Sequence, residues 1–429
     1  MGNWLLSDKI QASWAKGIDA QAVIDLLNST ITIDKEGKPR FGAFLHRDCC
    51  ALLFDMLEFS DAISETEGRS RLIKAVSSAA GSLPLTPNSI LSALNRSLAE
   101  YSELPLSRYV LVSALSIRNS SGLRPIQIHH ARIAFDSHLP RRFCEARASL
   151  GRRVQQALYS EPPKNYSPVR VQLKAKSTTE AAERAQYVLD LFRGIYNWLY
   201  NRSQPTRISF GSRDPVNRIA SGPIHTLHMP SGELATDTFW YEDTYRAPIG
   251  LVDIGKHVDV LVDSYRLVQS KLRSSGYRSA IEDCIVRYVR ALDDRDWHAE
   301  FLKLWGILEV LTVTTRSPRS ESTIERASYV FRDHRYQKAS LDILRNHRNK
   351  IVHASASTRE IETYLYQLKY CVEALFDFHL FARMKFAAID DAAQFLSLPV
   401  EKSALEARRD LAELALEYRL YQDPIGSEH

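Results

Sequence analysis

One segment of the sequence, Leu344–Ser355, collects side chains that can act on a phosphodiester. If the segment is helical, Arg345, Asn349 and His353 lie four residues apart and form a single polar stripe. Arg348 lies beside that stripe, and its long side chain can reach toward the histidine. The segment therefore predicts a histidine, an amide and two guanidinium groups gathered on one edge of a helix.

These residue types suit the cleavage of RNA. A histidine titrates near neutrality, so His353 can accept the proton of a ribose 2′-hydroxyl or donate one to the leaving oxygen. The guanidinium of Arg348 can bind phosphate in two places and stabilise the charge that develops on it, and Asn349 can orient either group. No metal is required, because the 2′-hydroxyl is already tethered beside the phosphorus atom. We therefore expect no metal and no other cofactor, and we expect Lys350 and His347 to add RNA-binding charge.

Glu309 is a second candidate, in a supporting role. Trp305 and Val313 stand four residues to either side and share its helix face, so we expect the carboxylate to be buried among apolar groups. A buried carboxylate needs a partner, and Arg348 or Arg345 would supply one and be oriented by it. The alternative is a partly exposed glutamate at the edge of a helix.

The residues from Arg348 to His353 read R-N-x-x-x-H and resemble the polar signature of ribonucleases of the HEPN superfamily. The upstream segment Leu304–Leu311 resembles the helix that precedes this signature in the ApeA-like branch of the superfamily. Residues 169–197 are similar to what precedes the domain in larger relatives. The resemblance covers the chain from about Gly276 to Tyr421, which is its C-terminal third.

The resemblance implies an RNA endonuclease in which Arg348 and His353 are catalytic and Asn349 is the polar residue that follows the arginine. It implies a homodimer joined through the C-terminal domain, with two motifs facing one composite site. It also implies a toxin or an anti-phage defence effector, with a regulatory or trigger protein as a further partner. Ser355 stands where some of these toxins carry a tyrosine that an antitoxin modifies, which does not favour that mode of control.

Two alternatives belong to other classes of protein. One is a catalytically inactive HEPN-like module that binds a nucleotide or a protein, and the other is a helical domain that only dimerises. In both, Arg348 and His353 would serve structure, as a helix cap or as the partner of a carboxylate. The presence of both residues favours the ribonuclease, because an inactive domain need keep neither.

The composition is that of a globular protein of several domains. The chain has 429 residues, of which 45% are hydrophobic and 25% are charged. Its net charge of +5 favours a polyanionic partner only mildly. The side chains of the arginine-rich run from Arg141 to Arg153 are expected to lie mostly in solvent.

The five cysteines include no CxxC pair, so neither a zinc site nor a disulfide framework is predicted. The sequence has no apolar run of roughly 20 residues, so we expect a cytoplasmic protein that does not associate with a membrane.

Hydrophobic periodicity predicts an α+β N-terminal and middle region followed by an all-α bundle. Arg108–Ile117 and Pro125–Phe135 read as strands, and a slip of the apolar phase near His130 suggests a bulge. Residues 169–175 alternate between apolar and polar, and a capping box at Ser177 begins the helix that follows.

Beyond Gly255 the periodicity is helical throughout. Phe301–Leu311 is apolar almost all round and should be the central helix, while Ser403–Tyr418 should lie on the outside. The breaker-rich segment Asn201–Glu233 is interpreted as a connection between domains. We therefore predict an N-terminal α+β region at 1–160, a strand–helix unit with its linker at 161–250, and a HEPN-like helical domain at 251–429.

Overall fold

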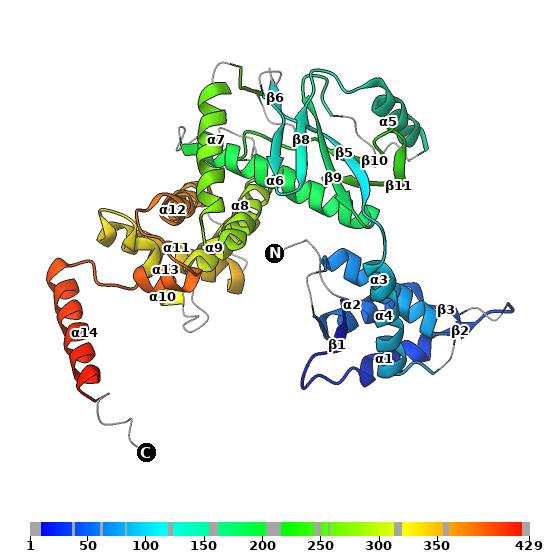
Figure 1. Cartoon of the computed structure of the whole chain (residues 1–429), viewed down its shortest axis with the longest axis horizontal. Helices are drawn as coiled ribbons and strands as arrows, with labels where there is room; N and C mark the ends of the chain where they lie inside the picture. Colours follow the sequence, from blue (N-terminus) through cyan, green and yellow to red (C-terminus); the bar gives the residue numbers. More distant parts are fainter. Residues whose placement is uncertain are drawn as a thin grey trace. The chain divides into compact units, whose positions relative to one another are not determined.

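The computed structural model describes residues 10–36, 39–60, 63–81, 84–118, 123–153, 162–202, 216–242, 245, 250–255, 258–312, 320–354 and 360–422. The chain forms two compact units (Figure 1). Unit 1 comprises Met1–Phe192 and Ile219–Val258, and unit 2 comprises Arg193–Arg218 and Asp259–His429. Unit 1 mixes helices with sheet, and the elements of unit 2 are helices, so the predicted order of an α+β region followed by a helical region is confirmed at this level.

The first part of unit 1 is a small group of helices with short strands. Its elements are β1 (Ala12–Trp14), α1 (Gln21–Thr30), β2 (Thr32–Ile33), β3 (Pro39–Arg40), α2 (Ala43–Asp55), β4 (Leu57–Phe59), α3 (Glu65–Ala79) and α4 (Pro87–Ser102). Local sequence fixes where the longer helices begin. The hydroxyl of Ser64 caps α3 by accepting a hydrogen bond from the amide of Glu67. Thr86 and Ser89 form a reciprocal capping box at the start of α4, where Pro87 occupies the first turn.

The rest of unit 1 is built on a six-stranded antiparallel sheet with the strand order β11-β10-β5-β9-β8-β7. Its strands are β5 (Ser107–Leu115), β7 (Ile126–Ile128), β8 (Ala131–Phe135), β9 (Ser167–Ala175), β10 (Ile224–His228) and β11 (Leu234–Tyr241). Two short strands, β6 (Ile117–Arg118) and β12 (Val252–Asp253), pair in parallel beside it. The strand predicted from Arg108 to Ile117 is therefore confirmed as β5 with its short continuation β6.

The strand predicted at Pro125–Phe135 is a hairpin, so the predicted bulge near His130 is wrong. β7 and β8 pair with each other, and a turn at His129 and His130 joins them. His129 has φ = 50°, a left-handed conformation that a reversal of the chain needs and a continuous strand does not. The slip in the apolar phase marks this reversal of the chain.

The two faces of the sheet differ, because β9 alternates as its sequence predicts. Val169 and Val171 are buried, while Arg170 between them points to the opposite face. The apolar face lies against α6 (Thr178–Arg202). Phe135 is the cross-strand partner of Val169, and its ring lies 5.1 Å from that of Phe192 on α6. The predicted start of this helix is confirmed, since Ser177 Oγ accepts a hydrogen bond from the amide of the residue three places later.

Helix α5 (Arg141–Arg153) covers part of the opposite face. Its Phe143 packs on Val110 and Val112 of β5. One turn later Arg147, which is 4% exposed, donates hydrogen bonds to the carbonyl of Val112 at 3.2 Å and to Thr226 Oγ1 at 3.1 Å. This arginine of the Arg141–Arg153 run is therefore a tether between α5 and the sheet, which differs from the solvated position expected for it.

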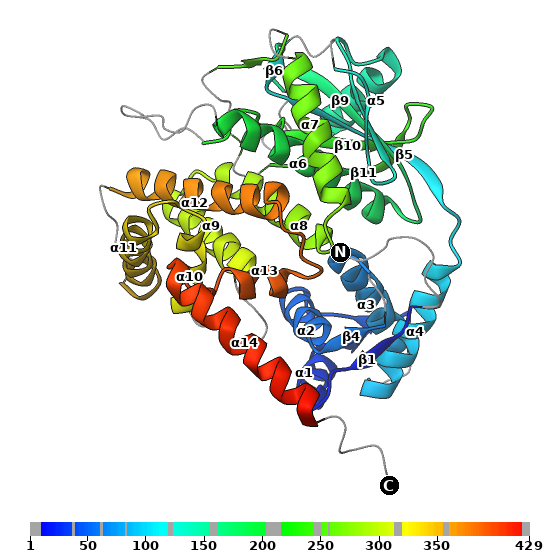
Figure 2. The same ribbon diagram turned by 60° about the vertical axis from the view of Figure 1, so that its left-hand side comes forward.

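Unit 2 is a helical bundle around one central helix. It contains the last turns of α6 together with α7 (Val258–Arg273), α8 (Arg278–Leu292), α9 (Trp297–Thr312), α10 (Ser320–Tyr329), α11 (His334–Ala354), α12 (Ile361–Phe381), α13 (Ile389–Phe395) and α14 (Lys402–Gln422). α9 packs against α8, α10, α11 and α12 (Figure 2). Its Phe301, Leu304 and Leu308 are fully buried, which confirms the prediction that Phe301–Leu311 is the central helix.

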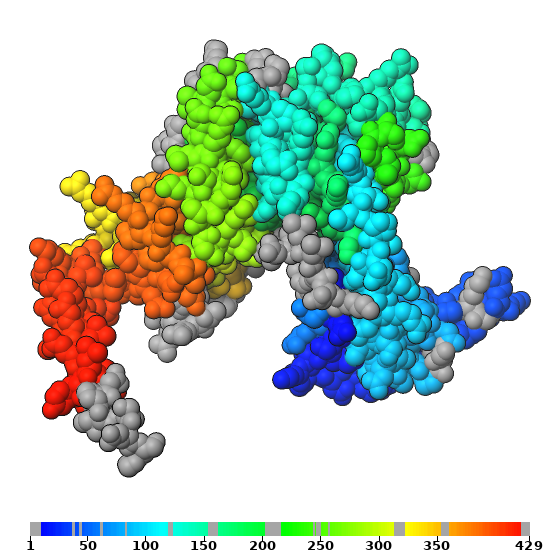
Figure 3. Space-filling model, viewed as in Figure 1, coloured from blue at the N-terminus to red at the C-terminus, as the bar shows by residue number. Residues whose placement is uncertain are grey.

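The last helix is exposed on nearly every turn. α14 extends a few residues beyond the predicted Ser403–Tyr418, and it lies on the surface in the space-filling view, where it is red (Figure 3). Leu411, Leu414 and Tyr418, spaced three and four residues apart, are all exposed. An exposed apolar stripe of this spacing suits packing against another helix.

The division into units differs from the predicted one at two places. The predicted boundary near residue 161 separates no units, because β9 pairs along its whole length with β5. The predicted connection Asn201–Glu233 contains β10, an interior strand of the sheet. Only five residues long and bounded by proline, β10 is too short to show a periodicity among the turn-forming residues around it. The second predicted boundary, near residue 251, lies close to the start of the long second segment of unit 2 at Asp259.

Two helical glycines of unit 2 give a matched test of its packing. An ideal Cβ on Gly194 of α6 would lie 2.7 Å from Ile285 Cγ2 and 2.8 Å from the Ile285 carbonyl oxygen of α8, whereas a Cβ on Gly306 of α9 would meet nothing within 4 Å. Gly194→Ala should therefore lower the free energy of unfolding by about 1–3 kcal/mol through overpacking. Gly306→Ala should leave it unchanged or raise it by up to about 1 kcal/mol, since alanine favours a helix. Urea unfolding measures both, and equal effects would show that α6 and α8 are not in this close contact.

Candidate functional site

Helix α11 carries the residues that the sequence singles out for chemistry. It runs without interruption from His334 to Ala354, so the four-residue spacing of Arg345, Asn349 and His353 places all three on one face. The opposite face enters the bundle, where Leu344 is fully buried. The helical conformation on which the predicted stripe depends is therefore confirmed.

The structure brings Arg348 and Asn349 together. Arg348 Nη1 donates a hydrogen bond to Asn349 Oδ1 at 3.2 Å on the exposed side of the helix. Asn349 and Lys350 are exposed, and Arg348 is half-buried. Arg345 lies one turn earlier and forms an ion pair with Asp342 at 3.0 Å. The amide thus holds the guanidinium of Arg348, while the charge of Arg345 is partly neutralised by a neighbour on its own helix.

The backbone of His353 lies in the last turn of α11, one turn after Asn349. Its side chain lies outside the described residues, as does the whole of Ser355. The backbone alone places the histidine at the end of the stripe that carries the exposed amide.

His347 occupies a different position from the one expected. It is 7% exposed, and its ring lies 5.2 Å from that of Phe301 and 5.0 Å from that of Tyr364. Burial lowers the pKa of this imidazole, and the nearby charges of His298 and Lys350 lower it further. His347 is therefore an uncharged core residue, and the expectation that it adds positive charge to an RNA-binding surface is not met.

Val352 also departs from the expected arrangement, in the opposite sense. As apolar residues of the same helical segment, Leu344, Ile351 and Val352 are all expected to face the core, but Val352 is 49% exposed and Ile351 is half-buried. The buried stripe of α11 follows Gln337, Leu341, Leu344 and His347. The next position of that stripe is Ile351, four residues after His347. Val352 follows one residue later and therefore lies on the side of the helix that faces solvent.

Glu309 has a different partner from either arginine proposed for it. The indole Nε1 of Trp305, one turn earlier on α9, donates a hydrogen bond to Glu309 Oε1 at 2.8 Å. Glu309 is partly exposed, which agrees with the alternative of a glutamate at the edge of a helix rather than a carboxylate buried among apolar groups. Val313, expected on the same face, lies outside the described residues. Glu309 is therefore held by a residue of its own helix. Among the described residues, neither Arg345 nor Arg348 of α11 is shown paired with it.

A chain of three polar residues in unit 1 has the composition of a nucleophilic triad. Ser113 Oγ lies 2.8 Å from His225 Nδ1, and His225 Nε2 lies 3.0 Å from Glu242 Oε1. However, Ser113 is only 3% exposed and His225 only 2% exposed, both within the sheet. A nucleophile must reach its substrate, so we interpret this chain as the hydrogen bonding that buried polar groups require.

The candidate site of α11 rests on its own geometry. Comparisons of the chain with protein-family models, curated proteins and solved structures gave no match. The part of the chain that the structure describes contains no group of three or more histidine, cysteine, aspartate or glutamate side chains placed to hold a metal ion. Within the same part, no helix has the length and apolarity needed to cross a membrane.

Proposed function

We propose that the protein is a metal-independent RNA endonuclease of the HEPN type, with its site on α11. The observation that supports this most is the hydrogen-bonded pair of Arg348 and Asn349 on a helix whose face continues to His353. A phosphate-binding fork, an amide that orients it and a titratable imidazole then share one helix edge. The cations Lys350 and Arg345 lie within one turn of the pair and supply further attraction for the RNA backbone.

In the proposed reaction the ribose 2′-hydroxyl attacks the adjacent phosphorus. The imidazole of His353 accepts the hydroxyl proton while the bond from O2′ to phosphorus forms. The bond from phosphorus to O5′ breaks, and the leaving oxygen takes up a proton to become a 5′-hydroxyl. Arg348 stabilises the negative charge that grows on the phosphoryl oxygens, because a guanidinium fork binds two of them at once. The products are a 2′,3′-cyclic phosphate and a 5′-hydroxyl end.

A homodimer would complete this site. Each chain carries one motif and therefore one histidine, whereas the reaction is served best by a base and an acid on opposite sides of the phosphate. Two chains related by a two-fold axis would supply both groups. The sequence also predicts interface roles for α9 and α12, because they carry more apolar surface than one small bundle readily buries, but most apolar side chains of both helices are buried within unit 2. The exposed apolar stripe of α14, at Leu411, Leu414 and Tyr418, is the surface we assign to a second copy.

The proposed biological role is that of a toxin or an anti-phage defence effector, with unit 1 as the sensing or regulatory part. An unregulated RNA endonuclease removes transcripts that its host needs, so its activity must be coupled to a trigger. The support for this role is the resemblance of the Arg348–His353 signature to that of HEPN ribonucleases.

Purified protein incubated with RNA in EDTA tests the proposed function. We expect cleavage that persists in the chelator and spares DNA of the same sequence, because DNA lacks the attacking 2′-hydroxyl. If two chains share one site, the activity per chain should fall as the protein is diluted below its dimerisation constant. RNA that stays intact at every protein concentration would instead favour an inactive module that binds a nucleotide or a protein.

A further inference from the structure

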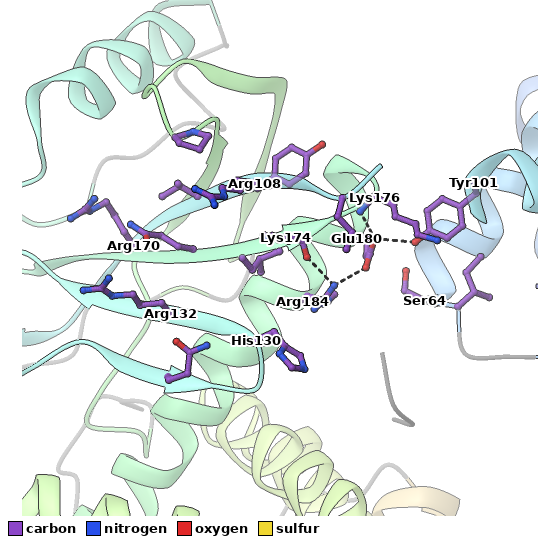
Figure 4. Close-up of a pocket in the computed structure, with 18 of the residues that line it drawn as sticks. Ser64, Tyr101, Arg108, His130, Arg132, Arg170, Lys174, Lys176, Glu180 and Arg184 are labelled. Carbon is purple, nitrogen blue, oxygen red and sulfur yellow. Dashed lines mark hydrogen bonds and ion pairs between the residues drawn. The ribbon is translucent and has the colours of Figure 1, made fainter. Parts of the chain in front are cut away.

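In the described part of unit 1, one region of the sheet lines a cavity, and several side chains of that region are basic. α6 covers the apolar face, and on the opposite face α5 covers the region around Val110 and Val112. The strand register places Arg108 of β5 directly opposite Lys174 of β9, and Arg132 of β8 opposite Gln172 of β9. Figure 4 shows Arg108, Lys174 and Arg132 on neighbouring strands.

A cavity of about 920 Å³ lies over this face, within unit 1. The cations from the sheet and from α5 that line it are Arg108, Arg132, Arg142, Arg170 and Lys174. Glu180 is the only carboxylate among its lining residues in the described part of the chain. It is already engaged, since it accepts hydrogen bonds from Tyr101 Oη at 3.0 Å and the Lys176 amide at 2.7 Å, and it pairs with Arg184 at 2.8 Å.

Two of the lining arginines are held in place. Arg170 donates to both oxygens of Asp136, at 2.6 and 2.8 Å, and its guanidinium lies over the ring of Phe143. The stem of Arg142 packs on Gly232, where an ideal Cβ would lie 2.5 Å from Arg142 Cγ. Gly232 has φ = 103° and belongs to the turn between β10 and β11, so both the conformation and the close approach require glycine.

The other cations lack a compensating charge. Among the described residues, no carboxylate lies within ion-pair distance of Arg108, Arg132 or Lys174. Like charges directly opposite each other on neighbouring strands destabilise a sheet, and Arg108 and Lys174 are such a pair. Since strands lie about 4.8 Å apart, these three cations span roughly 10 Å across β5, β9 and β8. Such a cluster is stabilised when an anion of matching length binds it.

We propose that this cavity is a binding site for a small ligand with at least two neighbouring phosphate groups. Arginine forks suit phosphate oxygens, and the spread of the cations is too wide for a single phosphate to contact all three. The cavity volume lies within the range of small-molecule sites, roughly 300–1,000 Å³, so the ligand is of nucleotide size. Ile10, Ile63 and Leu106 line the cavity as well and offer an apolar wall to the part of the ligand without phosphate.

Calorimetric titration of the full-length protein with pyrophosphate, and separately with ATP, tests this site. Both probes should bind, and Arg108→Ala and Lys174→Ala should each weaken binding at least about tenfold, the usual size of a lost charge-assisted hydrogen bond. Lys174→Arg should restore most of the affinity. The matched control is Arg141→Ala, since Arg141 is an exposed arginine on α5 that pairs with Glu145 and does not line the cavity.

Three results would overturn the assignment. The first is that neither probe binds, and the second is that the two cavity variants bind as tightly as the control variant. The third is that a short single-stranded oligoribonucleotide binds where pyrophosphate and ATP do not. The last result would mean that the basic face follows an extended strand. Because the site belongs to unit 1, RNA cleavage by the α11 site can succeed or fail independently of this outcome.

Discussion

His353→Ala is expected to lower the rate of RNA cleavage by about 10²–10⁴-fold, the usual cost of removing a general acid or base. Arg348→Ala should lose both phosphate binding and the stabilisation of developing charge, so it should lower the rate comparably. Arg348→Lys should recover little of the loss, because an ammonium keeps the charge without the fork. Cleavage of a labelled RNA under single-turnover conditions measures all three variants.

Helix α11 supplies its own controls. His334 and Arg335 have the same side-chain types at its other end, and Arg335 is exposed. His334→Ala and Arg335→Ala should therefore retain nearly the wild-type rate. Thermal unfolding should show all the variants folded, because Asn349, one turn before His353, is exposed and the catalytic stripe faces away from the core. If His353→Ala and Arg348→Ala cleave as fast as the controls, the roles proposed for these two residues are wrong.

Lys369→Met is expected to cause the largest loss of stability, about 3–5 kcal/mol in the free energy of unfolding of unit 2. Lys369 Nζ lies 2.9 Å from Glu373 Oε1 inside the bundle, and the two side chains are 2% and 7% exposed. Tyr288 also donates a hydrogen bond to Glu373. Burial strongly raises the pKa of Glu300, and the charge of Lys369 opposes that rise. Removing the lysine leaves Glu373 without its ion-pair partner and removes one of the two lysines, Lys303 and Lys369, that oppose the rise in the pKa of Glu300.

The control for this prediction is an exposed pair with the same spacing. Lys402 and Glu406 on α14 are also four residues apart, but their side chains are 88% and 49% exposed, so Lys402→Met should change stability by less than about 0.5 kcal/mol. The double variant Lys369→Met/Glu373→Leu should recover much of the loss, because no unpaired charge remains at that position. Urea unfolding in which Lys369→Met and Lys402→Met behave alike would contradict the buried ion pair.

The elements with strong, long periodicity were predictable from sequence. The central helix α9, the helical conformation of α11 and the alternation of β9 all follow from patterns that extend over several turns or residues. β10 was missed because five residues between prolines and glycines show no pattern. The hairpin of β7 and β8 was missed because one residue with positive φ reverses the chain within an apparently continuous strand.

The candidate site was predictable only in part. The spacing of Arg345, Asn349 and His353 defines one face of a helix, and that inference needs no knowledge of the fold. Whether His347 faces solvent or the core depends on the ring of Tyr364, which lies on the next helix. The basic cavity depends on strand register, which places Arg108 opposite Lys174 although they are distant in sequence. The polar face of β9 was a partial signal. The sequence alone did not show which strands pair with β9 or in which register they pair.

The most direct test of the central claim uses an RNA with one known cleavage position. In EDTA, we expect the wild-type protein to leave a 2′,3′-cyclic phosphate on one fragment and a 5′-hydroxyl on the other, both identified by mass spectrometry. A matched RNA with a single 2′-deoxy nucleotide at the scissile position should remain intact there, because the attacking group is missing. Cleavage of the deoxy-substituted RNA at the same position, or products that carry a 5′-phosphate, would contradict the proposed reaction of Arg348, Asn349 and His353.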